Sequence, residues 1–138
     1  MNSPDKKELR ILIVEDDTAN ARALERLLSR YGACCVAGDG QEAIDTIQHA
    51  FDNQSPMNLI CLDLGLPSVE GYEVLRQLRA LEREMGKSEE EFTTVIITTS
   101  DHHPRRMATA FMEGCQGYLI KPFVQCQIEE TLHSLGII

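Results

Sequence analysis

Ile11-Leu12-Ile13-Val14-Glu15-Asp16-Asp17 is the stretch that decides the fold, because four apolar residues lead directly into three acids. A second apolar run, Leu59-Ile60-Cys61-Leu62, ends on Asp63 in the same way. Runs rich in Ile, Leu and Val are typical of central strands in a parallel sheet that is covered on both faces. The functional crevice of such a sheet lies beyond the carboxyl ends of its strands, so these acids are predicted to meet there. Because carboxylates at close range repel one another, we interpret the cluster as a site for a hard cation.

The rest of the chain alternates between strand and helix patterns five times. Strands are expected over residues 9–14, 34–37, 58–62, 94–98 and 117–120, and helices over 18–31, 41–51, 72–84, 104–113 and 124–135. Gly32 is expected to stop the first helix, and Pro104 to begin the fourth. Five such units with short connections predict an α/β protein with a doubly wound parallel sheet. The 138 residues are expected to form one domain, with a core over about 8–136.

Four of the five predicted strands deliver polar groups at their carboxyl ends: Glu15-Asp16, Asp63, Thr99-Ser100 and Lys121. We expect Asp16 and Asp63 to bind a divalent ion such as Mg²⁺ directly, and Glu15 to reach it through water. Asp63 is also a candidate nucleophile, since a carboxylate that attacks a phosphoryl group forms an acyl phosphate. Lys121 would place a positive charge opposite that group, and the Thr99 hydroxyl would donate a hydrogen bond to it. Their convergence at separate strand ends is the main functional evidence in the sequence.

Asp17 has a simpler interpretation than its neighbours. It precedes Thr18 at the start of the first predicted helix, where Asp is a favoured N-cap residue. We therefore expect Asp17 to cap that helix and to take no part in the cation site.

These residues together resemble the receiver domain of two-component response regulators. The resemblance rests on Glu15-Asp16, Asp63 followed by Pro67 and Gly71, Thr99-Ser100, and Lys121-Pro122-Phe123, and it covers residues 8–136. It implies a flavodoxin-like (βα)5 fold with strand order 2-1-3-4-5 and a cis peptide bond at Lys121-Pro122. It implies that Asp63 is the phosphoacceptor and that Glu15, Asp16, Asp63 and the Gly65 backbone surround Mg²⁺. It also implies that Thr99 and Lys121 bind the phosphoryl group, and that Thr99 and Tyr118 form the switch.

The resemblance also implies partners. A sensor histidine kinase or a histidine phosphotransfer protein would supply the phosphoryl group, and a downstream protein would read the surface of helix four, strand five and helix five. Exposed positions expected on that surface are Arg105, Arg106, Met112, Gln125 and Glu129. The chain would then be a regulatory protein, not an enzyme, that assists its own phosphorylation and dephosphorylation, as a monomer or weak homodimer.

Charge and composition limit the other classes of partner. The formal charge of −9 disfavours nucleic acid and anionic membrane surfaces, which both require a basic face. No apolar stretch approaches the length of a transmembrane helix or resembles a signal peptide. The five cysteines contain no C-x-x-C and are interpreted as small apolar residues in a reducing compartment, so a cytoplasmic location is expected.

Three departures from the family pattern stand out. The segment between Asp63 and Thr99 is longer than usual, with the excess expected in a solvated loop over 81–92. Gly65 and Asp101 occupy the two positions at which relatives carry side chains near the attacking water. These two residues therefore bear on the lifetime of the phosphorylated form.

The sequence disfavours two other protein classes with a similar sheet, and it leaves two alternatives within the receiver resemblance. A haloacid-dehalogenase-type phosphatase needs a second Asp two residues after the nucleophile, where this chain has Gly65. A flavodoxin-type electron carrier needs a phosphate-binding loop where this chain has three acids. Two alternatives within the resemblance remain: a phosphorelay receiver from a hybrid kinase or larger regulator, and a scaffold receiver that is not phosphorylated.

Overall fold

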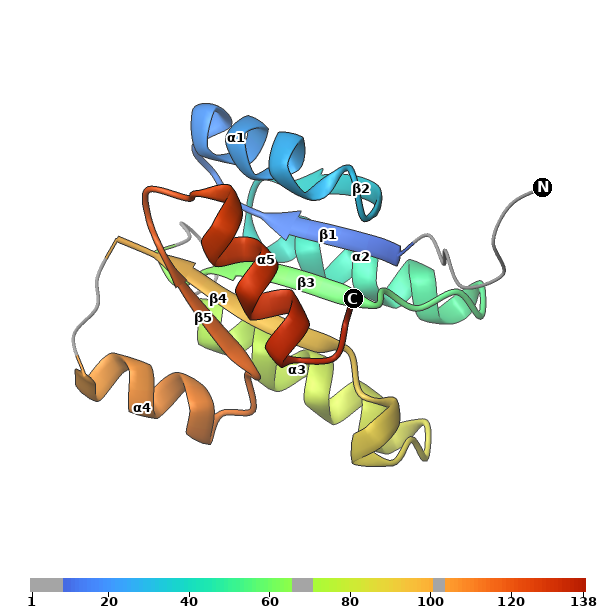
Figure 1. Ribbon diagram of the computed structural model, residues 1–138. Coiled ribbons are helices and arrows are strands. Elements are labelled where there is room, and N and C mark those ends of the chain that lie inside the picture. The colour runs from blue at the N-terminus through green and yellow to red at the C-terminus, as the bar shows by residue number, and fades with distance from the viewer. Residues whose placement is uncertain (1–8, 66–70, 101–103) are drawn as a thin grey trace.

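The computed structural model describes residues 9–65, 71–100 and 104–138, which form a five-stranded sheet between two layers of helices (Figure 1). The sheet is parallel throughout, and its order is β2-β1-β3-β4-β5. This confirms the predicted α/β class and strand order. The strands are β1 (Leu9–Val14), β2 (Gly32–Ala37), β3 (Leu59–Asp63), β4 (Thr94–Thr99) and β5 (Gly117–Ile120). The helices are α1 (Thr18–Leu28), α2 (Gly40–Asp52), α3 (Gly71–Glu84), α4 (Pro104–Met112), α5 (Gln125–Ser134) and a 3₁₀ turn, η1 (Glu89–Glu91).

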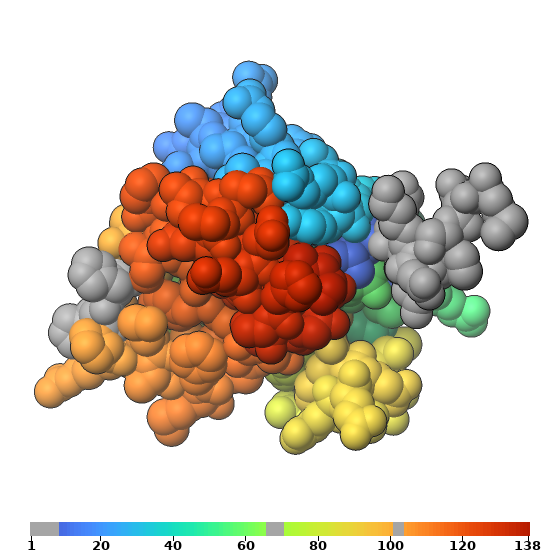
Figure 2. Space-filling model, viewed as in Figure 1, coloured from blue at the N-terminus to red at the C-terminus, as the bar shows by residue number. Residues whose placement is uncertain are grey.

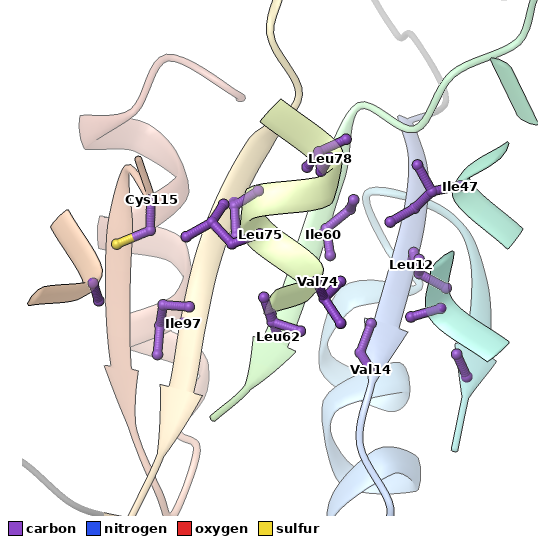
Figure 3. Packing of buried hydrophobic residues seen from close by; sticks show 14 of the residues in the cluster. Leu12, Val14, Ile47, Ile60, Leu62, Val74, Leu75, Leu78, Ile97 and Cys115 are labelled. Carbon is purple, nitrogen blue, oxygen red and sulfur yellow. The ribbon is translucent and has the colours of Figure 1, made fainter. Parts of the chain in front are cut away.

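The core consists of two apolar clusters, one on each face of the sheet. Side chains of a strand alternate between faces, so even-numbered residues of β1, such as Leu12, face α2 and α3, and odd-numbered ones, such as Ile11, face α1 and α5. Figure 3 shows the α2–α3 side, where Leu75 of α3 lies over the sheet near Ile60 and Ile97. Because both faces are covered, β1 and β3 can be apolar along most of their length, and β4 is apolar at its centre, residues 95–97, with Thr on either side.

The first helix ends earlier than its apolar spacing predicted. It stops at Leu28, and the turn after it is closed by the Tyr31 N–H, which donates to the Leu28 carbonyl at 2.9 Å. Gly32 is the first residue of β2 instead of the helix stop. A Cβ at this position would lie 2.2 Å from the Leu9 carbonyl oxygen, so the strand requires Gly here. The glycine therefore serves a close approach between strands, which the sequence pattern does not distinguish from a helix stop.

The segment between α3 and β4 is more ordered than the solvated loop that was predicted. It contains η1, and the residue before that turn, Ser88, forms a capping box with Glu91. Thr93 is buried, and Phe92 lies under the Arg79 guanidinium at 5.3 Å from the ring centre. In the part of the chain that the structure describes, none of the helices is long and apolar enough to cross a membrane.

Candidate functional site

Two neighbouring strands bring the predicted acids together. β1 and β3 pair in parallel with Val14 beside Leu62, so Glu15 and Asp16 follow β1 where β3 ends on Asp63. Glu15 and Asp63 are buried, at 4% and 6% exposure, whereas Asp16 is exposed. Carboxylate oxygens from the three residues all lie within 4.8 Å of one another. The predicted convergence of these acids is therefore present in the structure.

Lys121 lies among the acids and compensates part of their charge. Its Nζ is 2.7 Å from Glu15 Oε1 and 3.4 Å from Asp63 Oδ2. Burial raises the pKa of Glu15 more than the hydrogen bond from Lys121 lowers it. Burial lowers the pKa of Lys121, but its hydrogen bond to Glu15 and the charge of Asp63 outweigh this, so the net pKa is raised. The ammonium is thus held in its charged form, and its shorter contact is with Glu15, a pairing that the sequence analysis did not foresee.

Two glycines lie close to Asp63, and they differ in how tightly they are packed against it. The Gly65 N–H donates to Asp63 Oδ1 at 3.0 Å. A Cβ at Gly71 would lie 2.7 Å from the Asp63 carbonyl oxygen, so this position requires Gly. A Cβ at Gly65 would lie 3.7 Å from Asp63 Oδ1, an ordinary contact, so the approach to the carboxylate is not closed by a side chain there. Pro67 of the sequence motif falls outside the described residues.

The hydroxyl and aromatic residues of the predicted switch lie on β4 and β5. Thr99 ends β4 and is buried, one residue beyond the Thr98 that pairs with Asp63. The Lys121 N–H donates to the Thr99 carbonyl at 2.8 Å, so these two residues are held side by side. Tyr118 of β5 is half-buried and stacks on Phe111 of α4, with ring centres 6.5 Å apart. The peptide bond between Lys121 and Pro122 is cis, as the resemblance implied, whereas Asp101 falls outside the described residues.

The surface formed by α4, β5 and α5 carries most of the exposed positions that were predicted. Figure 2 shows α4 (orange) and α5 (red) exposed on the same face. Met112 is 88% exposed, and Arg105, Arg106 and Glu129 are exposed as well. Gln125 is a correction: it is half-buried, because its amide donates to the Tyr31 hydroxyl at 3.0 Å. Phe111, 48% exposed, also belongs to this surface and was not among the predicted positions.

The donor set fits a hard divalent cation. Three carboxylates offer oxygen ligands at one edge of the sheet, and one of them, Asp16, is open to water. Mg²⁺ prefers oxygen ligands and keeps several waters, which matches a partly open site. The carboxylate of Asp63 sits beside both this cluster and a lysine ammonium, an arrangement suited to stabilising an anionic group on Asp63.

Comparison with known proteins gives consistent matches over nearly the whole chain. Residues 11–133 match the response regulator receiver domain. The sensory/regulatory protein RpfC of Xanthomonas campestris pv. campestris is 26% identical over 133 residues, which cover 95% of this chain and 17% of that protein. The chain spans half or less of the length of the curated relatives that it matches.

Two solved structures share the fold. The receiver domain of a sensor histidine kinase from Pseudomonas aeruginosa, solved with a magnesium ion in its active-site cleft, has a TM-score of 0.74 at 23% identity, covering 94% of this chain and 99% of that chain. The receiver domain of Ssk1 from Saccharomyces cerevisiae, solved with the histidine phosphotransfer protein Ypd1, has a TM-score of 0.70 at 28% identity, covering 94% of this chain and 84% of that chain.

Proposed function

The chain belongs to the response regulator receiver family of two-component systems, and from this premise we propose that Asp63 accepts a phosphoryl group from a phosphohistidine on a partner protein. The observation that carries the proposal is the convergence of Asp63 with two further carboxylates and the Lys121 ammonium at one sheet edge. The family is regulatory. The complex of the Ssk1 receiver with a histidine phosphotransfer protein supports a donor of this class.

In the proposed transfer, an Asp63 carboxylate oxygen forms a bond to phosphorus while the bond from phosphorus to the histidine nitrogen breaks. The electron pair of that bond returns to the imidazole, so the step balances without another reactant. Asp63 is 6% exposed, which limits competition from water, and Gly65 places no side chain beside its Oδ1. Lys121 Nζ, 3.4 Å from Asp63 Oδ2, is placed to bind an oxygen of the incoming group.

We propose that Glu15, Asp16, Asp63 and the Gly65 carbonyl hold Mg²⁺ during this transfer. The bound ion would neutralise charge on the transferring phosphoryl group. Glu15 has a second part to play, because its 2.7 Å pairing with Lys121 positions the ammonium before the phosphoryl group arrives. When Lys121 binds the phosphoryl group, its ammonium would donate to that group as well as to Glu15 and Asp63.

Thr99 and Tyr118 would transmit the phosphorylation of Asp63 to the surface as a conformational change. Thr99 lies beside Lys121 at the end of β4, where its hydroxyl can turn to the phosphoryl oxygens. Tyr118 stacks on α4, so a displacement of Thr99 and α4 changes the packing of this ring. A downstream protein would then read the surface of α4, β5 and α5, including Met112 and Phe111.

The test is intact-mass spectrometry after incubation with acetyl phosphate, with and without Mg²⁺. One phosphoryl addition is expected in wild type with Mg²⁺ and none in Asp63→Asn. Asp17→Asn is the matched control, because it removes a neighbouring acid that caps α1 and lies outside the cluster. Absence of any addition to a wild-type protein that demonstrably binds Mg²⁺ would contradict the proposal and favour a scaffold receiver.

A further inference from the structure

A buried ionic network lies at the end of the sheet remote from the acid cluster. Arg79 of α3 is 3% exposed, and its Nη1 donates to Glu82 Oε1 at 2.7 Å. Its Nη2 and Nε both donate to the Gly114 carbonyl, at 2.8 and 3.2 Å, and Nη2 also contacts Gln116 Oε1 at 3.0 Å. One guanidinium therefore joins α3 to the turn between α4 and β5.

Backbone N–H groups at the start of β4 also donate to the acidic and amide side chains of this network. The second oxygen of Glu82, which is 0% exposed, accepts from the Thr93 N–H at 2.6 Å. Gln116 Oε1 also accepts from the Val95 N–H at 2.7 Å. Buried, charge-assisted hydrogen bonds of this kind are strong, and removing one partner leaves the others unsatisfied.

The network fastens the C-terminal end of α4. Gly114 has φ +107°, and its N–H donates to the Phe111 carbonyl, while the Cys115 N–H donates to the Ala110 carbonyl, so these residues terminate the helix. Arg79 then holds the carbonyl of Gly114 itself. A Cβ at Gly114 would lie 3.2 Å from Arg79 Nε, which shows how closely the two are packed.

The N-terminal half of α4 is mostly exposed to water: residues 104–106 and 108 are exposed, and Met107 is half-buried. Ala110 is the one fully buried residue of this helix. The Tyr72 hydroxyl donates to the Arg106 carbonyl at 3.0 Å in an exposed contact. Arg76 pairs with Glu113, the residue after α4, at 2.9 Å in an exposed ion pair. Because so little of this half is buried, it can be displaced at lower cost than the C-terminal end, which Arg79 holds.

We propose that Arg79 fixes the C-terminal end of α4, so that phosphorylation of Asp63 displaces the N-terminal half of the helix about a pivot at Gly114. The proposal rests on the phosphoryl-accepting function above. It makes Arg79 a positioning residue: it touches no reacting group, but it decides which part of α4 moves. Phe111, three residues before the pivot, would move less than Arg105 and Arg106, so the basic end of the helix would carry most of the change that a partner reads.

The test is residue-resolved amide hydrogen exchange by NMR, with and without beryllofluoride as a stable substitute for the phosphoryl group, in the presence of Mg²⁺. In wild type, exchange is expected to change at residues 107–110 and to stay the same at Gly114 and Cys115. In the double variant Arg79→Met/Glu82→Gln, which avoids leaving one buried charge unpaired, Gly114 and Cys115 should exchange roughly ten- to hundredfold faster. Their exchange should also become sensitive to beryllofluoride, a response that loss of stability alone does not produce.

Arg76→Met is the matched control, because Arg76 is on the same helix and also contacts the segment after α4, at Glu113, but in an exposed pair. It should behave as wild type. The proposal is overturned if Gly114 and Cys115 respond to beryllofluoride as strongly as 107–110 in wild type, or if the double variant and Arg76→Met behave alike. Arg79→Lys, which keeps the charge but cannot bridge three acceptors as a planar fork, should give the same pattern in weaker form if the double variant does not fold.

Failure of the proposed function is distinguished by the mass of the intact protein. If wild type takes up no phosphoryl group and its exchange does not respond to beryllofluoride anywhere, both the proposed function and the proposed pivot at Gly114 are refuted. If wild type takes up the phosphoryl group but the exchange pattern is uniform along α4, only the pivot falls.

Discussion

Removing the charge of Asp16 tests directly whether the acid cluster is a cation site that costs stability when no cation is bound. Asp16 contributes one of three carboxylates whose oxygens lie within 4.8 Å of one another. Asp16→Asn keeps the size of the side chain and removes its charge. We expect the metal-free variant to be more stable than wild type, and to gain less stability from Mg²⁺.

The magnitude follows from the spacing and the exposure. Two unit charges 4.8 Å apart repel by about 1 kcal/mol in water and by about 3.5 kcal/mol at an effective dielectric constant of about 20. Asp16 is exposed, so the lower figure applies to each of its two pairs, and Lys121 offsets part of the total. The net gain on Asp16→Asn should be about 1 kcal/mol, which raises the melting temperature by roughly 3–4 °C for a chain of this size.

Mg²⁺ should stabilise wild type more than Asp16→Asn, by a difference slightly larger than the advantage of the variant without metal. At a free Mg²⁺ concentration about 100 times the wild-type Kd, binding stabilises wild type by about 2.7 kcal/mol. If loss of one carboxylate weakens binding about tenfold, the same concentration stabilises Asp16→Asn by only about 1.4 kcal/mol. The two proteins should therefore change order of stability between metal-free and Mg²⁺-containing solutions.

The assay is urea unfolding at constant ionic strength, with a chelator in one series and Mg²⁺ in the other. Asp17→Asn is the control: it removes the same charge one residue away, and Asn caps α1 as well as Asp does. It should show the wild-type response to Mg²⁺. Equal Mg²⁺-induced stabilisation of wild type and Asp16→Asn would remove Asp16 from the site, and a metal-free Asp16→Asn less stable than wild type would refute the electrostatic reasoning.

Two further predictions concern the backbone near Asp63 and the core. Gly71→Ala should destabilise the protein by about 1–3 kcal/mol in urea unfolding, because the new Cβ would lie 2.7 Å from the Asp63 carbonyl oxygen and 2.9 Å from Leu64 Cα; an unchanged midpoint would contradict this packing. Burial raises the pKa of the Cys61 thiol to about 12, so the unfolded chain loses this proton first and wild-type stability falls as pH rises above 9. Cys61→Ala should reduce that fall by roughly 1.4 kcal/mol per pH unit between pH 9.5 and 11, measured by urea unfolding at several pH values, and parallel pH profiles would refute it.

The parts of the fold that the sequence predicted correctly are those with strong local signals. β1 and β3 are mostly apolar and β4 has an apolar centre at residues 95–97, and the central place of these strands in the sheet followed from that composition. The acids at their ends could be assigned to one edge because parallel strands leave no other arrangement. Element ends were less certain, as Gly32 shows: the signal for a helix stop and the need for a close strand approach are both met by Gly.

The surface of α3 was the least predictable feature. The apolar residues at helical spacing in this helix are Val74, Leu75, Leu78 and Leu81; the first three are buried, and Leu81 is half-buried. The sequence analysis did not single out Arg79 or Glu82, yet both are buried, because Arg79 has partners in the α4–β5 turn and Glu82 accepts from the Thr93 N–H just before β4. Residues of these types are almost never buried unless paired, and sequence spacing does not reveal a pair.

The amino-acid sequence by itself determined the strand and helix alternation, the sheet class and the four strand ends at which the polar groups meet, because these depend on periodicity and on the geometry shared by all parallel sheets. Only the tertiary structure decided that Lys121 contacts Glu15 more closely than Asp63, and that Arg79 holds the end of α4. Asp63 and Lys121 are 58 positions apart in the chain, and Arg79 and Gly114 are 35 positions apart. Such partners are selected by packing across elements, for which no local pattern in the sequence exists.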